Sequence, residues 1–174
     1  MLNLAKITSP TLLLNEQKCW ANLKKLAQQA AKHNVQLAPH FKTHQSAQVS
    51  QWYRDYGVKA ITVTSVKMAR YFAEHGWDDI TIAMPINIRE IKAINTLASQ
   101  IRLTVFVNSV ETARLLHEQV TAPLPFYVEV DTGYHRSGVA SDDTEEIRAI
   151  LAAAQGSQLQ FTGFYSDAGH TYGA

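Results

Sequence analysis

The sequence predicts an α/β protein in which helices cover a parallel β-sheet. Short apolar runs recur along the 174 residues, and segments with helical spacing of apolar residues separate them. The runs are apolar along their length rather than alternating, as in parallel strands that are buried on both faces. With 46% apolar residues and a net charge of +1, the chain has enough apolar side chains for a real core. We therefore expect one globular unit.

The expected strands come first in each repeat. They are residues 35–41, 60–64, 80–84, 102–107, 125–130 and 159–165. A further apolar run at residues 11–14 is a candidate extra strand, which its spacing does not place in the sheet.

Helix signals fill the intervals between these strands. Ser65 and Ser109 each follow a strand and suit the N-cap of a helix. Gly76 and Gly156 fall where helix ends favour a left-handed residue, and acids crowd the start of the expected helix at residues 142–154.

Repetition of strand and helix fits either an open doubly wound sheet or a (β/α)8 barrel of the TIM type. Such a barrel needs about 250 residues. The chain has only about six such units, so a barrel would lack its last two strands, and we expect residues 1–174 to be a fragment, with both folds still open.

Composition excludes several classes of protein. Lysine and arginine form no block that would bind nucleic acid, and no apolar run approaches the length of a membrane span. The first ten residues lack the apolar core of a secretory leader, and Cys19 is the only cysteine, which rules out an internal disulfide. We expect a cytoplasmic protein with no nucleic-acid or membrane partner.

Lys42 lies in Pro-His-Phe-Lys-Thr-His, at the end of the first expected strand. A lysine that is buried at a strand end loses solvation, and a neutral amine can attack a carbonyl group. Lys42 is thus a candidate anchor for pyridoxal phosphate or a carbonyl substrate, but its position alone favours a lysine that merely marks the exit of the strand into solvent. His40 and His44 flank it and suit either a catalytic or a structural role.

A glycine-punctuated loop follows the expected strand 125–130 and carries Asp131, His135 and Arg136. Gly133 and Gly138 permit sharp turns that would bring Arg136 over the strand ends, where its guanidinium could bind a phenolate, carboxylate or phosphate. In the alternative interpretation, Asp131 and Arg136 form an ion pair that only stabilises the loop.

Tyr165 and His170 lie in the third polar cluster, after the last expected strand. An aromatic ring at a strand end can stack on a planar cofactor, although Tyr165 also suits the core. No pair of the seven histidines has the spacing of metal ligands, so no metal site is predicted in this chain.

Taken together, PHFKTH, EVDTGYHRSGV and GFYSDAGHTYG, in this order, resemble the D-threonine aldolase and D-serine dehydratase group of alanine-racemase-like (fold type III) pyridoxal-phosphate enzymes. The resemblance spans nearly the whole chain. It implies an incomplete (β/α)8 barrel like the N-terminal part of alanine racemase.

The resemblance also implies roles for the site residues. Lys42 would form the internal aldimine with pyridoxal 5'-phosphate and act as the base, and Arg136 would contact the phenolic oxygen of the cofactor. Tyr165 would lie beside the cofactor ring, and His135 and His170 would line the site.

In this group Asp131 would support the Arg136 loop, and residues 11–14 would pair with a C-terminal β-domain. That domain, together with the last barrel strands, is absent from this chain, and it would hold the expected divalent metal. The resemblance implies a homodimeric lyase for a small D-3-hydroxy amino acid. An amino-acid racemase, a non-catalytic pyridoxal-phosphate-binding barrel and an inert scaffold remain alternatives.

Overall fold

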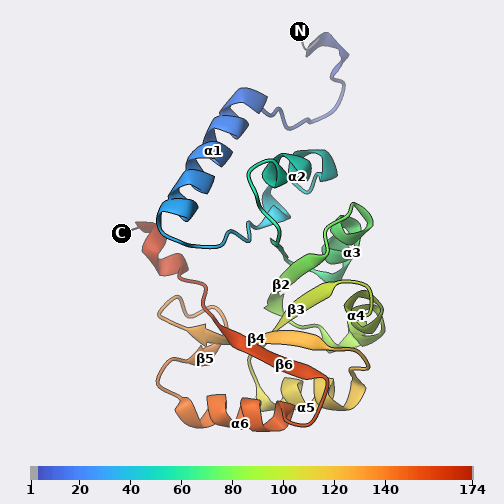
Figure 1. Ribbon diagram of the computed structural model, residues 1–174, viewed down its shortest axis with the longest axis vertical. Coiled ribbons are helices and arrows are strands. Elements are labelled where there is room, and N and C mark those ends of the chain that lie inside the picture. Colours follow the sequence, from blue (N-terminus) through green and yellow to red (C-terminus); the bar gives the residue numbers. More distant parts are fainter. Residues whose placement is uncertain (1–3, 174) are drawn as a thin grey trace.

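The computed structural model describes residues 4–173 and confirms an α/β fold built on a parallel sheet (Figure 1). The strands run in the order β1-β2-β3-β4-β5, and β6 also pairs with β4. All of these pairings are parallel. The strands are β1 Ile61–Val63, β2 Asp79–Pro85, β3 Arg102–Val107, β4 Leu124–Asp131, β5 Val139–Ala140 and β6 Leu159–Tyr165.

The expected first strand at residues 35–41 is wrong. Only His40 forms an isolated parallel bridge, with Thr62 of β1. The Thr62 backbone N–H donates to the Pro39 carbonyl at 2.9 Å, and its hydroxyl donates to the Ala38 carbonyl at 2.8 Å. Because Pro39 has no N–H to return, the segment follows the edge of β1 without forming a ladder.

The other five expected strands are confirmed to within two residues at each end. The sequence analysis did not predict β5, which is too short for a periodic signal and follows the glycine-rich loop. Residues 11–14 form no strand in the described part of the chain, and Leu12 there is 86% exposed.

The helices separate the strands as expected. They are α1 Glu16–Lys32, α2 Ala47–Arg54, α3 Val66–Glu74, α4 Ile91–Ala98, α5 Val110–Gln119 and α6 Thr144–Ala154. Ser65 and Ser109 cap α3 and α5 as predicted, each by accepting a backbone N–H. Gly76 and Gly156 both have positive φ just beyond helix ends, which confirms their predicted left-handed conformation.

The core lies between the sheet and helices α3 to α6, which Figure 1 shows packed along the strands. Leu103, Leu116, Leu124 and Ile150 are fully buried there. Helix α1 extends away from the sheet and buries only Leu23.

Residues 1–3, which belong to the segment judged above to lack a leader, lie outside the described residues, as does residue 174. No helix within residues 4–173 is both long enough and apolar enough to cross a membrane.

Candidate functional site

A cavity of about 370 Å³ lies at the carboxyl ends of β2 and β6. It gathers residues from all three polar motifs of the sequence. Its lining residues are His40, Lys42, Ala83, Met84, Tyr134, Arg136, Tyr165, Asp167 and Tyr172. Four of the predicted site residues are thus brought together, namely His40, Lys42, Arg136 and Tyr165.

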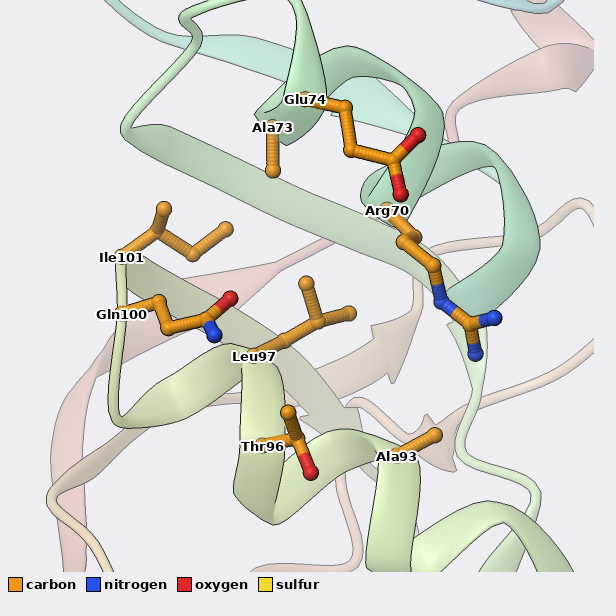
Figure 2. A pocket seen from close by; sticks show the side chains of 8 residues that line it. All are labelled: Arg70, Ala73, Glu74, Ala93, Thr96, Leu97, Gln100 and Ile101. Carbon is orange, nitrogen blue, oxygen red and sulfur yellow. The ribbon is translucent and has the colours of Figure 1, made fainter.

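A larger cavity of about 500 Å³ lies between α3 and α4 and is shown in Figure 2. Arg70 and Glu74 line it from α3, and Gln100 and Ile101 line it just before β3 begins. Those residues place it at the amino end of the strands, whereas ligands of parallel α/β folds bind at the carboxyl ends. The smaller cavity is therefore the candidate active site.

Lys42 is positioned by the residue that precedes it. Phe41 is fully buried, and its ring lies 5.0 Å from that of Phe72 and 5.3 Å from that of Trp77. Burying a phenylalanine side chain stabilises a fold by about 2 to 3 kcal/mol, so Phe41 anchors the short 3-10 turn η2, Phe41–Thr43. The side chain of Lys42 is exposed where it lines the cavity, which agrees with the alternative of an exit into solvent, and its role as an anchor stays a prediction.

His40 caps the turn that carries the lysine. The backbone N–H of Lys42 donates to His40 Nδ1 at 3.3 Å, so the proton of the neutral ring lies on Nε2. Burial and the nearby Lys42 ammonium lower the pKa of His40 to about 4, although the Asp167 carboxylate opposes them. His40 is therefore a neutral hydrogen-bond donor at physiological pH.

His44 lies away from the cavity, in the aromatic cluster beneath η2. Its ring stacks on Tyr53 with centroids 5.6 Å apart and meets the edge of Phe41 at 4.6 Å. Burial lowers its pKa, and Nε2 is buried without a hydrogen-bond partner among residues 4–173. Its predicted catalytic role stays a prediction.

Asp131 organises the loop that carries Arg136. One carboxylate oxygen accepts the backbone N–H groups of Gly133 at 2.9 Å and His135 at 3.0 Å, and the other lies 2.9 Å from His135 Nδ1. The two backbone N–H donors, with His135, lower the pKa of Asp131 to about 2. Asp131 thus supports the loop as expected, but the alternative ion pair between Asp131 and Arg136 is wrong.

The guanidinium of Arg136 instead forms an ion pair with the carboxylate of Asp167, which follows β6. Its central carbon lies 5.6 Å from the ring centroid of Tyr134, within the range of a cation–π contact. The sequence analysis did not assign Asp167 or Tyr134 to the site. Asp167 stands two residues beyond Tyr165, and its place after a strand is the one signal that could have singled it out.

Tyr165 forms the inner wall of the cavity. Its ring packs on Phe106 with centroids 4.1 Å apart. Burial raises the pKa of Tyr165, and the carboxylates of Asp167 and Glu129 raise it further against the opposing charge of Arg136. Tyr165 is therefore a neutral phenol that presents an aromatic face beside the charged residues.

Glu129 stabilises the other end of the same loop. It is 2% exposed, and its Oε1 accepts the hydroxyl of Ser137 at 2.7 Å. The loop that bears Arg136 is thus held at both ends by carboxylates from β4, since Asp131 binds its start and Glu129 binds its end.

His135 and His170 do not line the cavity. The ring of His135 is 82% exposed and is held by Asp131. His170 is exposed on the 3-10 turn η4, Gly169–Gly173, where its ring lies beside Gly133. Both border the loop, and their contribution to the site stays a prediction.

Metal ligands do not gather in this structure. Within residues 4–173, no three His, Cys, Asp or Glu side chains come together in a group that could hold a metal ion.

Comparison by sequence matches residues 14–171 to the family described as "Alanine racemase, N-terminal domain". The chain is 29% identical to D-threo-3-hydroxyaspartate dehydratase of Delftia sp. (strain HT23), over 97% of this chain and 46% of that protein. It is 25% identical to D-serine dehydratase of Dictyostelium discoideum, over 95% of this chain and 46% of that protein. The chain thus spans about half the length of the curated relatives it matches.

Comparison by structure finds relatives of the same kinds as the sequence comparison. The solved D-threo-3-hydroxyaspartate dehydratase from Delftia sp. HT23 superposes with a TM-score of 0.90 at 27% identity, over 97% of this chain and 45% of that one. The D-threonine aldolase from Filomicrobium marinum superposes with a TM-score of 0.84 at 28% identity, over 92% and 44%.

Proposed function

The chain belongs to the alanine racemase N-terminal domain family, and from this membership we propose that it is the cofactor-binding part of a pyridoxal-phosphate-dependent lyase for D-3-hydroxy amino acids. Relatives named as dehydratases of D-serine and D-threo-3-hydroxyaspartate and as a D-threonine aldolase support this reaction class. Their substrates share an amino group on the α-carbon and a hydroxyl on the β-carbon.

The observation that carries the proposal is the convergence of Lys42, Arg136 and Tyr165 on one cavity at the strand ends. Lys42 and Tyr165, the first and last of these residues, are 123 positions apart in the sequence. The parallel sheet nevertheless brings all three together. The three groups match the three features of such a cofactor. An amine can bind its aldehyde, a guanidinium can bind its phenolic oxygen, and an aromatic face can pack against its planar ring.

The cavity suits pyridoxal 5'-phosphate in size and chemistry. Its volume of about 370 Å³ falls within the range of small-molecule sites. Lys42 would hold the cofactor by its aldehyde carbon, Arg136 by its phenolic oxygen and Tyr165 by its ring. When bound, pyridoxal phosphate withdraws electrons from the α-carbon of an attached amino acid, which weakens the bonds to that carbon.

The residues of this chain then move and hold protons. Lys42 Nζ takes the proton from the α-carbon when the β-hydroxyl is to leave. In a retro-aldol reaction a base takes the proton of the β-hydroxyl and the Cα–Cβ bond breaks. His40 can donate a hydrogen bond only from Nε2, because its Nδ1 accepts the Lys42 backbone N–H. Asp167 and Tyr134 hold the guanidinium of Arg136 in place.

The same proposal covers the wider protein. We infer that residues 1–174 form the N-terminal part of a longer enzyme, whose further barrel strands bind the cofactor phosphate and whose C-terminal domain holds the expected divalent metal. The enzyme would be a cytoplasmic homodimer. The share of each relative that the chain covers, about 46%, supports this division.

Turnover by the longer enzyme tests the proposal. With pyridoxal phosphate, D-serine or D-threonine should yield either a 2-oxo acid and ammonia or glycine and an aldehyde. Lys42→Ala should lower kcat at least about a thousandfold because it removes both the anchor and the base. Lys59→Ala, an exposed lysine just before β1, should leave kcat unchanged. Full turnover by Lys42→Ala would overturn the proposal.

A further inference from the structure

Tyr134 packs against Gly169, a residue that has no side chain. A Cβ atom at Gly169 would lie 2.6 to 2.8 Å from three neighbouring carbon atoms of the Tyr134 ring. Nearly equal distances to three adjacent ring atoms place that Cβ position over the face of the ring. Carbon atoms that are not bonded to each other lie about 3.5 to 4.0 Å apart. The ring can therefore occupy its place only because residue 169 is glycine.

The same ring lies against the arginine of the cavity. The central guanidinium carbon of Arg136 is 5.6 Å from the centroid of the Tyr134 ring, and the guanidinium also forms an ion pair with Asp167. A guanidinium in this position is attracted by the electrons of the ring. The segment after β6 thus acts on Arg136 in two ways, directly through Asp167 and indirectly from Gly169 through Tyr134.

From these contacts we propose that Gly169 is a positioning residue for Arg136, because it admits the Tyr134 ring that holds the guanidinium toward the cofactor. The inference rests on the proposed function, in which Arg136 binds the phenolic oxygen of the cofactor, and it adds a residue to the support of that contact. A side chain that is already held loses less freedom on binding than a mobile one. The glycine should therefore raise the affinity for pyridoxal phosphate.

The ion pair with Asp167 is compatible with this role of Arg136. The pair is formed by Nη2 of the guanidinium, and a guanidinium has five N–H donors in a planar fork. Donors on the other nitrogen atoms remain for the phenolic oxygen. Whether they face it depends on the plane of the fork. The Tyr134 ring restrains that plane, and the space at Gly169 decides where the ring lies.

Gly169→Ala is a selective way to displace the ring. Gly169 does not have a positive φ, so alanine can adopt its backbone conformation. The new methyl group would meet the ring of Tyr134, a residue that is 42% exposed and can move toward solvent. The variant should therefore fold and move the ring from its place beside Arg136. The matched control is Gly173→Ala on the same turn, where a Cβ would meet no atom within 4 Å.

Chemical modification of arginine measures how firmly Arg136 is held, without the cofactor. The longer enzyme would be treated with phenylglyoxal, and the rate at each arginine would be followed by mass spectrometry of its peptides. In Gly169→Ala the rate at Arg136 should rise about threefold, because the ring contact is lost. Arg102, which pairs with Asp79 where β2 and β3 begin, should react at one rate in every variant. Gly173→Ala should change neither rate.

Tyr134→Ala tests whether the ring transmits the effect. It should raise the rate at Arg136 at least as much as Gly169→Ala does. Adding Gly169→Ala to it should have no further effect, because the ring that the methyl group displaces is gone. An equally strong effect of Gly169→Ala in this background would overturn the inference. Should Gly169→Ala not fold, Tyr134→Ala decides, since a raised rate at Arg136 supports the inference and an unchanged rate overturns it.

Binding of pyridoxal phosphate separates this inference from the proposed function. Equilibrium dialysis of the longer enzyme should find the dissociation constant about threefold higher in Gly169→Ala and unchanged in Gly173→Ala. Unchanged affinity, or an unchanged rate at Arg136, in folded Gly169→Ala would overturn the inference and leave the proposed function standing. If the unaltered enzyme binds no pyridoxal phosphate, the proposed function fails, and the modification rates alone decide whether Gly169 positions Arg136.

Discussion

His40 links the backbone of the lysine turn to the electrostatics of the cavity. Its Nδ1 receives the N–H of Lys42, and its ring lines the cavity beside Asp167 and Lys42. A protonated His40 would lose its acceptor and would place a further positive charge next to the lysine. The fold therefore favours the neutral ring.

The first prediction concerns the pH dependence of stability. The pKa of His40 is about 4 in the folded chain and near its ordinary value of 6.5 in the unfolded chain, so the unfolded chain binds more protons between these values. The stabilising contribution of the neutral ring is complete above about pH 6.5 and is lost as the pH falls toward 4. In His40→Asn, which retains a side-chain acceptor for the cap, the urea midpoint should fall less between pH 7 and pH 5.

His44 limits how much of the pH dependence of stability His40→Asn removes. Burial lowers its pKa also, so the variant should keep part of the pH dependence. An identical loss of stability in His40→Asn and the unaltered chain would show that His40 is not held neutral by the fold.

Gly138 allows the second prediction. It has φ +103°, and a Cβ there would lie 2.9 Å from the Asp131 backbone nitrogen. Gly138→Ala should therefore lower the free energy of unfolding by at least about 2 kcal/mol, through backbone strain and the clash. Gly57 has φ +79° with no atom near its Cβ position, so Gly57→Ala should cost only about 1 kcal/mol. If urea denaturation finds the same loss of stability for Gly138→Ala and Gly57→Ala, the close approach of the Gly138 Cβ position to the Asp131 backbone is contradicted.

At the residue scale, the sequence singled out Lys42, Arg136 and Tyr165, which all line the cavity, because each is a chemically distinctive side chain that follows an expected strand or ends one. It could not reveal the partner of Arg136. Asp131 is closer in sequence, but the loop turns so that Asp131 binds backbone N–H groups and Asp167 receives the guanidinium. Which carboxylate pairs with Arg136 therefore depends on the backbone geometry of the loop after β4 and of the segment after β6.

At the scale of elements, strong local signals were sufficient for helices and central strands. Ser65 accepts the backbone N–H of Met68, and the strand before it consists of β-branched residues, which favour strands. The segment before Lys42 was misjudged because its apolar residues resemble a strand, whereas Pro39 cannot donate to a ladder.

The third prediction tests the cap of α3, which begins directly after β1. Ser65→Ala should lower the free energy of unfolding by about 1 kcal/mol, since the Met68 N–H loses its acceptor. Ser65→Asp keeps an acceptor and should restore most of that loss. If urea denaturation finds Ser65→Ala as stable as the unaltered chain, the cap contributes nothing to α3.

At the scale of the molecule, the parallel α/β sheet was predictable because apolar runs and helical spacing alternate throughout. The closeness of the three motifs followed from the same inference, since parallel strands bring their carboxyl ends to one edge. The exposure of Lys42 agrees with the alternative that its position alone favoured. It depends on which other segments cover the strand ends, and residues 4–173 leave the lysine uncovered.

Covalent mapping of the cofactor tests the central claim, that Lys42 is the anchor for pyridoxal phosphate. The longer enzyme would be mixed with pyridoxal phosphate, reduced with borohydride, digested and examined by mass spectrometry. The account predicts a visible absorption band that reduction removes, and a pyridoxyl group on Lys42 that is absent from Lys42→Ala. An adduct on other lysines, with Lys42 unmodified, would contradict it.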